Sequence, residues 1–140
     1  MIRYEFDTPI SPAALADLRE AVGWNRMERD LADPRLHNAF HLCAIDSDRL
    51  VGYVVVVSNG VTDAYIQDLM VHPDKQKQGV GRELMQRTLA RLRSEGVYMV
   101  SVIYGEAALQ RYYEELGFYT MLCGQLELRP ERDEAGSEAP

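Results

Sequence analysis

The chain contains little lysine, cysteine or tryptophan. Of its 140 residues, only two are lysine, two are cysteine and one is tryptophan. Neither the two cysteines nor the three histidines have the spacing of a metal-binding motif, so we expect no metal cofactor. We expect Cys43 and Cys123 to be reduced thiols. The formal net charge of −7 argues against a nucleic-acid partner, because phosphate backbones are bound by basic faces.

Long hydrophobic runs are also missing. The longest candidate, VGYVVVVS, has the length of a strand and not of a membrane-spanning helix. The N-terminal stretch MIRYEFD lacks the basic-then-apolar pattern of a signal peptide. We therefore expect a cytoplasmic protein with no membrane partner. Length and composition predict one domain over residues 1–128, followed by a flexible acidic tail over residues 129–140.

Hydrophobic periodicity predicts a chain in which strands and helices are interspersed. The expected strands cover residues 1–6, 40–46, 50–58, 64–71, 97–104 and 119–128, the last as one or two strands. The expected helices cover residues 11–22, 25–33, 81–94 and 106–116. We expect Ser11 to cap the first helix with Pro12 at its first position, and Asn25 to cap the second. Tyr112, on the apolar stripe of the last helix, is expected only to pack. Short turns make the three central strands antiparallel, whereas a crossover helix requires parallel neighbours. We expect an α/β (α+β) fold with a mixed, mostly antiparallel sheet flanked by helices.

The stretch VHPDKQKQGVGREL places both lysines, Lys75 and Lys77, beside a glycine turn that opens a helix. The first N–H groups of a helix have no acceptor within the helix, and the helix dipole makes this end positive. Glycines also let a phosphate approach the backbone closely. The sequence is neither a P-loop nor the dinucleotide-binding motif. It therefore indicates either a phosphate site or an ordinary strand–helix turn.

Two ordered motifs resemble those of the GCN5-related N-acetyltransferases, the GNAT family. LMVHPDKQKQGVGRELM is similar to motif A, with Gln76, Gly79 and Gly81 at the signature positions. ALQRYYEELGF is similar to motif B, which is filled by Tyr113, Glu114, Leu116, Gly117 and Phe118. The resemblance extends from the first strand to about Leu128 and is specific over residues 65–118. It implies the GNAT acyl-CoA N-acyltransferase fold, with acetyl-CoA as cosubstrate.

The resemblance also implies where coenzyme A would bind. The backbone of residues 69–71 would pair with the pantetheine arm, and the backbone N–H groups of residues 77–82 would hold the pyrophosphate. The implied cofactor-binding residues are Leu69, Met70, Val71, Gln76, Lys77, Gln78, Gly79, Val80, Gly81, Arg82 and Glu106. Glu106 departs from the family, because many relatives carry an asparagine there. An ionised glutamate donates no N–H, so the alternatives are an acid/base group, a binder of a cationic amine and a residue of a helix first turn.

Two residues are candidate catalysts. By resemblance, Tyr113 would protonate the leaving thiolate, while its alternative is a core aromatic. A backbone N–H of Met70 or Val71 is a candidate to stabilise the oxyanion. Asp68 is a candidate base, because a carboxylate amid apolar strand residues has a raised pKa; its alternative is a solvent-facing or bulge-capping residue. Tyr65 stands where histone-type enzymes have a glutamate base, which argues against protein-lysine acetylation.

The sequence gives the least information about how the acceptor amine is bound. Trp24 is either a wall of the acceptor site or a core anchor, and Gln67 is a further candidate for substrate binding. We expect N-acetylation of a small-molecule primary amine by direct transfer in a ternary complex. The alternatives are a non-catalytic acyl-CoA sensor on the same fold and an amino-sugar-phosphate acetyltransferase. A toxin that acetylates charged tRNA would need a basic face. A homodimer is possible.

Overall fold

The structure is a computed structural model that describes residues 1–130. Most of the tail predicted over residues 129–140 lies outside the described residues. The elements are β1 (Ile2–Phe6), α1 (Pro12–Ala21), α2 (Glu28–Leu31), the 3-10 turn η1 (Pro34–Leu36), β2 (Phe40–Asp46), β3 (Arg49–Ser58), β4 (Asp63–Val71), the 3-10 turn η2 (Pro73–Lys75), α3 (Val80–Ser94), β5 (Met99–Val102), the 3-10 turn η3 (Ala107–Leu109) and α4 (Gln110–Glu115). None of the described helices is both long and apolar enough to cross a bilayer.

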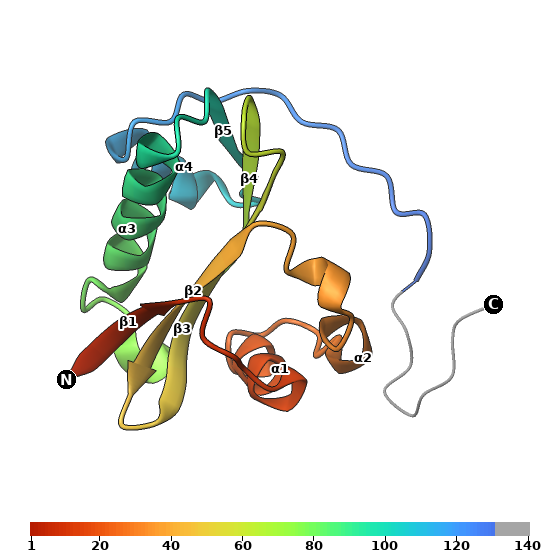
Figure 1. The fold of residues 1–140 in the computed structure, drawn as a ribbon, viewed down its shortest axis with the longest axis vertical. Helices are drawn as coiled ribbons and strands as arrows, with labels where there is room; N and C mark the ends of the chain where they lie inside the picture. Colours follow the sequence, from red (N-terminus) through yellow and green to blue (C-terminus); the bar gives the residue numbers. More distant parts are fainter. Residues whose placement is uncertain (131–140) are drawn as a thin grey trace.

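The five strands form one sheet in the order β1-β2-β3-β4-β5 (Figure 1). Strands β1 to β4 pair antiparallel with one another in chain order, and β5 pairs parallel to β4. The predicted mixed, mostly antiparallel sheet is therefore confirmed. The parallel pair follows from the crossover through α3, because a strand that returns by way of a helix enters in the same direction.

Helices cover both faces of the sheet, and each face has its own core. Leu84, Met85 and Leu89 of α3 pack on one face together with Tyr113 of α4. Leu15 and Leu18 of α1 pack on the opposite face, against alternate residues of the same strands. The alternation arises because neighbouring strand residues point to opposite faces. Strands β2 and β3 are thus apolar on both faces.

The start of α1 follows the sequence prediction, whereas the start of α2 does not. The Ser11 hydroxyl accepts a hydrogen bond from the Ala14 N–H at 3.1 Å, and Pro12 occupies the first helical position. We predicted that Asn25 would cap the second helix. Instead α2 begins at Glu28 after a left-handed Met27, and Asn25 accepts hydrogen bonds from Arg19. The Asn25 cap was therefore wrong, because a long-range partner engages this side chain.

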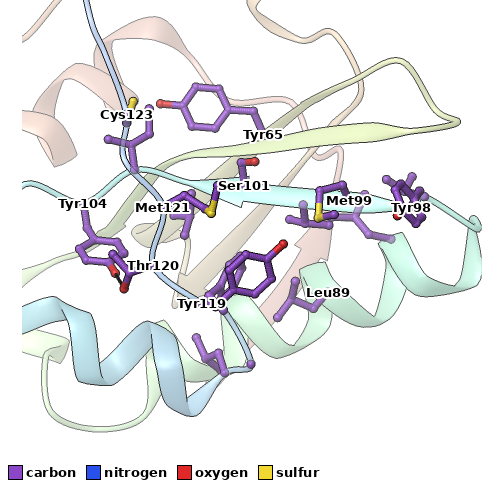
Figure 2. A pocket seen from close by; sticks show the side chains of 18 of the residues that line it. Tyr65, Leu89, Tyr98, Met99, Ser101, Tyr104, Tyr119, Thr120, Met121 and Cys123 are labelled. Atoms are coloured by element: carbon purple, nitrogen blue, oxygen red, sulfur yellow. Dashed lines mark hydrogen bonds between the residues drawn. The ribbon is translucent and has the colours of Figure 1, made fainter.

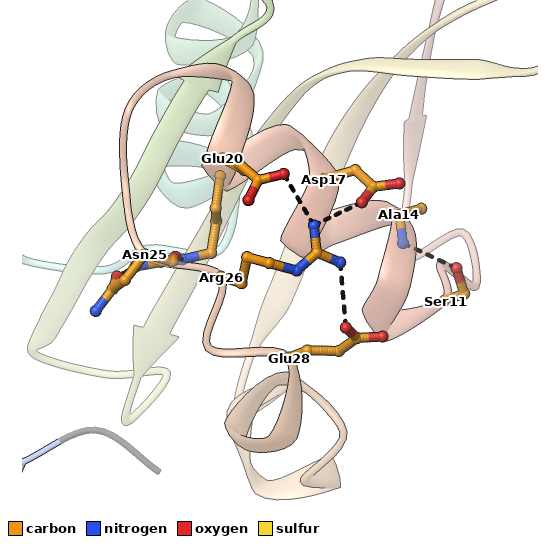
Figure 3. A network of polar contacts seen from close by, with 8 residues as sticks. Ser11, Ala14, Asp17, Glu20, Asn25, Arg26 and Glu28 are labelled. Atoms are coloured by element: carbon orange, nitrogen blue, oxygen red, sulfur yellow. Dashed lines mark hydrogen bonds and ion pairs between the residues drawn. The ribbon is translucent and has the colours of Figure 1, made fainter. Parts of the chain in front are cut away.

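An arginine joins the two N-terminal helices. Arg26, in the loop between them, lies 2.8 Å from the Asp17 carboxylate and 3.3 Å from that of Glu20, both on α1 (Figure 3). Its guanidinium also lies 3.1 Å from the carboxylate of Glu28, at the start of α2. One cation among three carboxylates thus fixes the path of the loop that carries Trp24.

The predicted strand over residues 119–128 was wrong. This segment is extended but forms no strand in the part of the chain that the structure describes. It passes from the C-terminal end of α4 around the sheet toward α2, where Arg129 lies 2.8 Å from Asp30 (Figure 1). The apolar content of this segment is compatible with a strand, but no strand among residues 1–130 pairs with it.

Candidate active site

Strand β4 changes its pairing halfway along. Residues Asp63–Ile66 pair with β5, and the parallel ladder then ends. The register with β3 shifts over the next residues, where Asp68 adopts a left-handed φ of 55°. Such a bulge bends a strand and increases its local twist. Within residues 1–130, the backbone of residues 67–71 therefore has no strand partner on the β5 side, which leaves it available to an extended ligand.

The glycine turn lies at the end of this strand. Gln76 Nε2 donates a hydrogen bond to the Val71 carbonyl at 3.0 Å and ties the loop to β4. Lys77 and Gly79 have left-handed φ angles of 62° and 85°. No side chain caps the N-terminus of α3. The N–H groups of the first helical turn therefore face outward with the positive end of the helix dipole, which is an arrangement that binds anions.

The two lysines of the turn have different environments. Lys75 Nζ lies 2.9 Å from the carboxylate of Asp46, and this contact lowers the pKa of Asp46. Among residues 1–130, no ion pair involves Lys77. Arg82 lies 3.5 Å from the Glu115 carboxylate and is half exposed. The charge that remains for an anion therefore comes from Lys77, Arg82 and the helix end, and not from Lys75.

Tyr113 lies on α4, enclosed by other aromatic rings. Its ring stacks on Tyr104 at 4.8 Å and meets Tyr112 and Phe118 edge-on at 5.0 and 5.9 Å. The side chain is buried, and burial raises its pKa to about 12. The phenol therefore stays protonated across the physiological pH range. Tyr113 is therefore a core aromatic that keeps its proton, and its role as proton donor to the thiolate remains a prediction.

Tyr112 was expected only to pack. Its hydroxyl is buried without a hydrogen-bond partner among the described residues. A Cβ built on Gly81 would lie 3.6 Å from this hydroxyl and 3.5 Å from Val71. The hydroxyl thus lies beside the first turn of α3, close to the end of β4. An unpaired buried hydroxyl carries a desolvation cost that no hydrogen bond within the described residues offsets.

Asp68 meets a buried arginine at the bulge. Arg19 of α1 is 8% exposed, and its Nη1 lies 3.3 Å from Asp68 Oδ2. The other donors of Arg19 are held by Asn25, at 2.7 Å to its carbonyl and 2.8 Å to its side-chain oxygen. Burial raises the pKa of Asp68, and the charge of Arg19 partly offsets this rise. The carboxyl is therefore a stronger proton acceptor than an exposed aspartate, and it is rigidly positioned.

The sequence analysis did not identify Arg19. Its partners are six residues and 49 residues away in the chain, so no local pattern connects them. One signal was available: Leu15, Leu18 and Val22 form the apolar stripe of α1, and Arg19 lies four residues after Leu15, on the same face. A charged residue on the buried face of a helix requires a partner.

The remaining candidates occupy different surroundings. Trp24 is 41% exposed and lies 5.3 Å from the Arg19 guanidinium, which makes it a poor core anchor and leaves it beside the Asp68 contact. Gln67 precedes Asp68 in β4 and pairs with Val55, whose side chain packs on the α1 face. Glu106 is exposed and flanks η3 without capping it. Within residues 1–130, no cluster of three acidic, histidine or cysteine side chains is placed to hold a metal ion.

These features have counterparts in known proteins. The sequence profile of the Acetyltransferase (GNAT) family matches residues 7–118. Because this match covers most of the chain, the chain belongs to the GNAT acetyltransferase family. The family assignment made from motifs A and B is therefore confirmed, and so is the fold class.

Similar sequences carry acetyltransferase names. An uncharacterized N-acetyltransferase, ycf52, of Gracilaria tenuistipitata var. liui is 27% identical and matches 82% of this chain and 65% of its own length. The chloroplastic serotonin N-acetyltransferase 2 of Oryza sativa subsp. japonica is 29% identical and matches 79% of this chain and 58% of its own length. The chain thus spans less than two thirds of the length of these relatives.

Solved structures agree with the fold. A GNAT family acetyltransferase of Streptococcus pneumoniae TIGR4 superposes with a TM-score of 0.75 at 28% identity, covering 94% of this chain and 100% of its own. A putative acetyltransferase of Deinococcus radiodurans R1 gives 0.71 at 27% identity, with 99% and 94% coverage. A GNAT family acetyltransferase of Brucella melitensis, solved in complex with acetyl-CoA, gives 0.68 at 18% identity over 86% and 84%, which supports the fold alone.

Proposed function

We propose that the chain is an acetyl-CoA-dependent N-acetyltransferase that acts on a primary amine of a small molecule by direct transfer. The observation that carries the proposal is the separation of β4 from β5 beyond Ile66, directly before an uncapped glycine turn. A strand backbone without a partner suits an amide-containing arm, and the turn suits a diphosphate. Coenzyme A has both groups, because its amide-containing pantetheine arm is joined to a diphosphate.

The residues of the turn fit a coenzyme A diphosphate. The N–H groups from Lys77 to Arg82 surround the N-terminus of α3, where two left-handed residues turn the backbone outward. The backbone groups of residues 69–71 that face away from β3 would pair with the pantetheine amides. Gln76 is engaged with Val71, so we assign it to holding the loop. The exposed carboxylate of Glu106 is not suited to donate to the pantetheine arm.

The chemistry requires two proton transfers. The amine must lose a proton before or during its attack on the thioester carbonyl, and we assign Asp68 to accept it, directly or through water. As the carbon–nitrogen bond forms and the carbon–sulfur bond breaks, the thiolate takes a proton from the Tyr113 hydroxyl. A pKa of about 12 makes that phenol a weak acid. The same burial would also raise the pKa of the thiol that leaves beside Tyr113. This reduces the difference in pKa between the phenol and the thiol.

The cysteines support direct transfer. Cys43 is fully buried beneath α1, and burial raises the pKa of its thiol to about 12. At neutral pH almost none of it is thiolate, which is the nucleophilic form. Cys123 lies on the exposed segment after α4. An acyl-enzyme on Cys43 is therefore disfavoured, and alignment of two substrates remains the main source of rate enhancement.

The acceptor side indicates an amine with an apolar or aromatic body. Trp24 presents an exposed ring beside Arg19, whose guanidinium also contacts Asp68, and Gln67 offers an amide next to Asp68 in β4. One relative is named a serotonin N-acetyltransferase, and serotonin is an arylalkylamine. We therefore propose arylalkylamines as the first acceptor class. An amino-sugar phosphate is the second class, although the buried cation here, Arg19, is already engaged with Asp68 and Asn25.

Binding and turnover measured together test this function. Acetyl-CoA affinity is measured by calorimetry, and thiol release is followed with arylalkylamines, polyamines and amino-sugar phosphates. We expect both binding and amine-dependent turnover. Tight binding of acetyl-CoA without turnover on any amine would favour the sensor alternative, and the absence of binding would contradict the coenzyme site itself.

Gly79→Val is expected to weaken acetyl-CoA binding by about ten-fold. Space does not limit this position, because nothing lies within 4 Å of a Cβ there, but its φ of 85° is strained for a β-branched residue. Valine would shift the N–H groups away from the diphosphate. Gly79→Asn is the control, because asparagine tolerates left-handed backbone. Equal affinity for acetyl-CoA in the glycine and valine proteins would place the diphosphate elsewhere.

Arg19→Gln is expected to move the acid limb of kcat/KM to higher pH. Burial already raises the pKa of Asp68 above its ordinary value, and Arg19 is the group that lowers it. Without this cation the Asp68 carboxylate takes up its proton at a higher pH. Arg19→Lys should partly restore the wild-type position of the acid limb. Arg26→Gln, in the loop that follows α1, serves as the control because the partners of Arg26 do not include Asp68. An unmoved limb in Arg19→Gln would show that Asp68 is not the titrating base.

A further inference from the structure

Tyr104 lies where the two parallel strands part. The β4–β5 ladder ends at the pair of Ile66 and Val102, and β5 itself ends at Val102. Tyr104 follows two residues later, and its partly buried side chain packs on the same core as Val102, beneath α3 and α4. Tyr104 is thus attached to the sheet at the point where the backbone of β4 loses its strand partner.

Tyr104 is the one parallel neighbour of the Tyr113 ring among the aromatic contacts of residues 1–130. The two rings stack at 4.8 Å, with an angle of 15° between their planes. Tyr112 and Phe118 meet Tyr113 at 81° and 89°. These two residues belong to α4 and to the turn that follows it. Tyr104 is therefore the aromatic contact that fixes the Tyr113 ring relative to the sheet.

The Tyr104 side chain is itself fixed at its hydroxyl. This hydroxyl lies 3.1 Å from Thr120 Oγ1, and the two side chains face each other (Figure 2). Gln110 Nε2 donates a second hydrogen bond to Thr120 Oγ1 at 3.2 Å. Gln110 is the first residue of α4, one turn before Tyr113. Tyr104 is thus held at its ring face and at its hydroxyl, and both contacts lead to α4.

The Tyr113 hydroxyl depends on ring packing for its direction. Within residues 1–130, no side-chain hydrogen bond involves this hydroxyl. A proton donor acts over a heavy-atom distance of about 2.6–3.2 Å, so a small tilt of the ring can break the contact with the acceptor. A misplacement of about 1 Å can cost on the order of 100-fold in rate. The neighbouring rings therefore set the line along which the phenol can donate.

We propose that Tyr104 is a positioning residue for acetyl transfer, because its ring holds the Tyr113 phenol in line with the leaving sulfur. The inference rests on the proposed function, in which the carbon–sulfur bond breaks and the sulfur takes the proton of the Tyr113 hydroxyl. Tyr104 exchanges no proton in this step and acts only through Tyr113. Removal of the Tyr104 ring should therefore slow the chemical step without weakening the binding of acetyl-CoA.

Single-turnover kinetics of Tyr104→Leu test this role. We expect the transfer rate constant to fall by about five-fold, because a displaced donor loses less than a deleted one, while acetyl-CoA affinity is unchanged. Tyr104→Met, whose flexible side chain fills irregular space, should lose as much, and it replaces the leucine variant if that one does not fold. Tyr104→Phe keeps the stacked ring and should keep the rate within about two-fold. Tyr98→Leu is the control, since Tyr98 is 79% exposed.

A double-mutant cycle with Tyr113→Phe separates positioning from general damage to the fold. Without the Tyr113 hydroxyl there is no donor to align, so Tyr104→Leu should not lower the rate further in that background. Equal losses in the two backgrounds, a wild-type rate without the Tyr104 ring, or a Tyr104→Phe variant as slow as Tyr104→Leu would overturn this inference alone. A wild-type protein without amine-dependent turnover would contradict the proposed function, and this inference with it.

Discussion

Asp68→Asn is expected to lower kcat/KM at neutral pH by about 100-fold, the usual effect of removing a general base. Asparagine is a conservative probe at this position. It tolerates the left-handed backbone at φ 55°, and its side-chain oxygen can still accept the hydrogen bond from Arg19. What it lacks is a carboxylate that takes up a proton. The acid limb of the pH profile should vanish in the same variant.

Stability provides the internal control for Asp68. A carboxyl group whose pKa is raised by folding favours the fold while it is protonated, and this contribution is lost as pH rises through the folded-state pKa. At neutral pH the neutral asparagine avoids the cost of a charge in this partly buried position. The unfolding temperature of Asp68→Asn should therefore equal or exceed that of the wild type. A catalytic loss accompanied by clear destabilisation would indicate a structural role instead.

Tyr113→Phe is expected to lower kcat by about ten-fold or more, with acetyl-CoA affinity nearly unchanged. Phenylalanine keeps the stacking on Tyr104 and the edge contacts with Tyr112 and Phe118. Only the proton donor is removed. The pKa of about 12 also predicts that ionisation of Tyr113 does not limit activity below about pH 11. Single-turnover kinetics measure the chemical step directly.

Tyr112→Phe is the matched comparison for Tyr113→Phe. It removes a hydroxyl from the adjacent position of the same helix, and that hydroxyl is buried without a partner. Its loss should leave kcat within about two-fold and should preserve or raise stability, because an unsatisfied polar group is removed. An unchanged chemical step in Tyr113→Phe, or an equal loss in both variants, would remove the assigned role of Tyr113.

Local chemistry in the sequence predicted the regular elements well. The Ser11 cap, the proline after it and the apolar face of α3 each act within one or two helical turns. The strands around the glycine turn followed from alternation and turn residues. The segment over residues 119–128 failed because apolar content shows only that a stretch can form a strand. Which edge it pairs with depends on tertiary structure that the pattern does not contain.

Less of the candidate site could be predicted from the sequence. Asp68 was identified as a base candidate from its apolar neighbours, but its bulge and its contact with Arg19 depend on residues 49 positions apart. Lys75 was expected to add charge to the phosphate site, yet it pairs with Asp46 at the end of β2. Strand register decides which side chains meet across the sheet. The sequence therefore predicted which element carries each residue, but not which residue it contacts.

The central claim is that this fold transfers an acetyl group from acetyl-CoA to a small amine. Its most direct test is to incubate the purified wild-type protein with acetyl-CoA and each amine of the panel, and to measure released thiol and N-acetylated product in the same sample. The account predicts equal amounts of thiol and acetylated amine, with arylalkylamines among the best acceptors. Thiol release that does not depend on the amine, or no acetylated product with any amine, would contradict it.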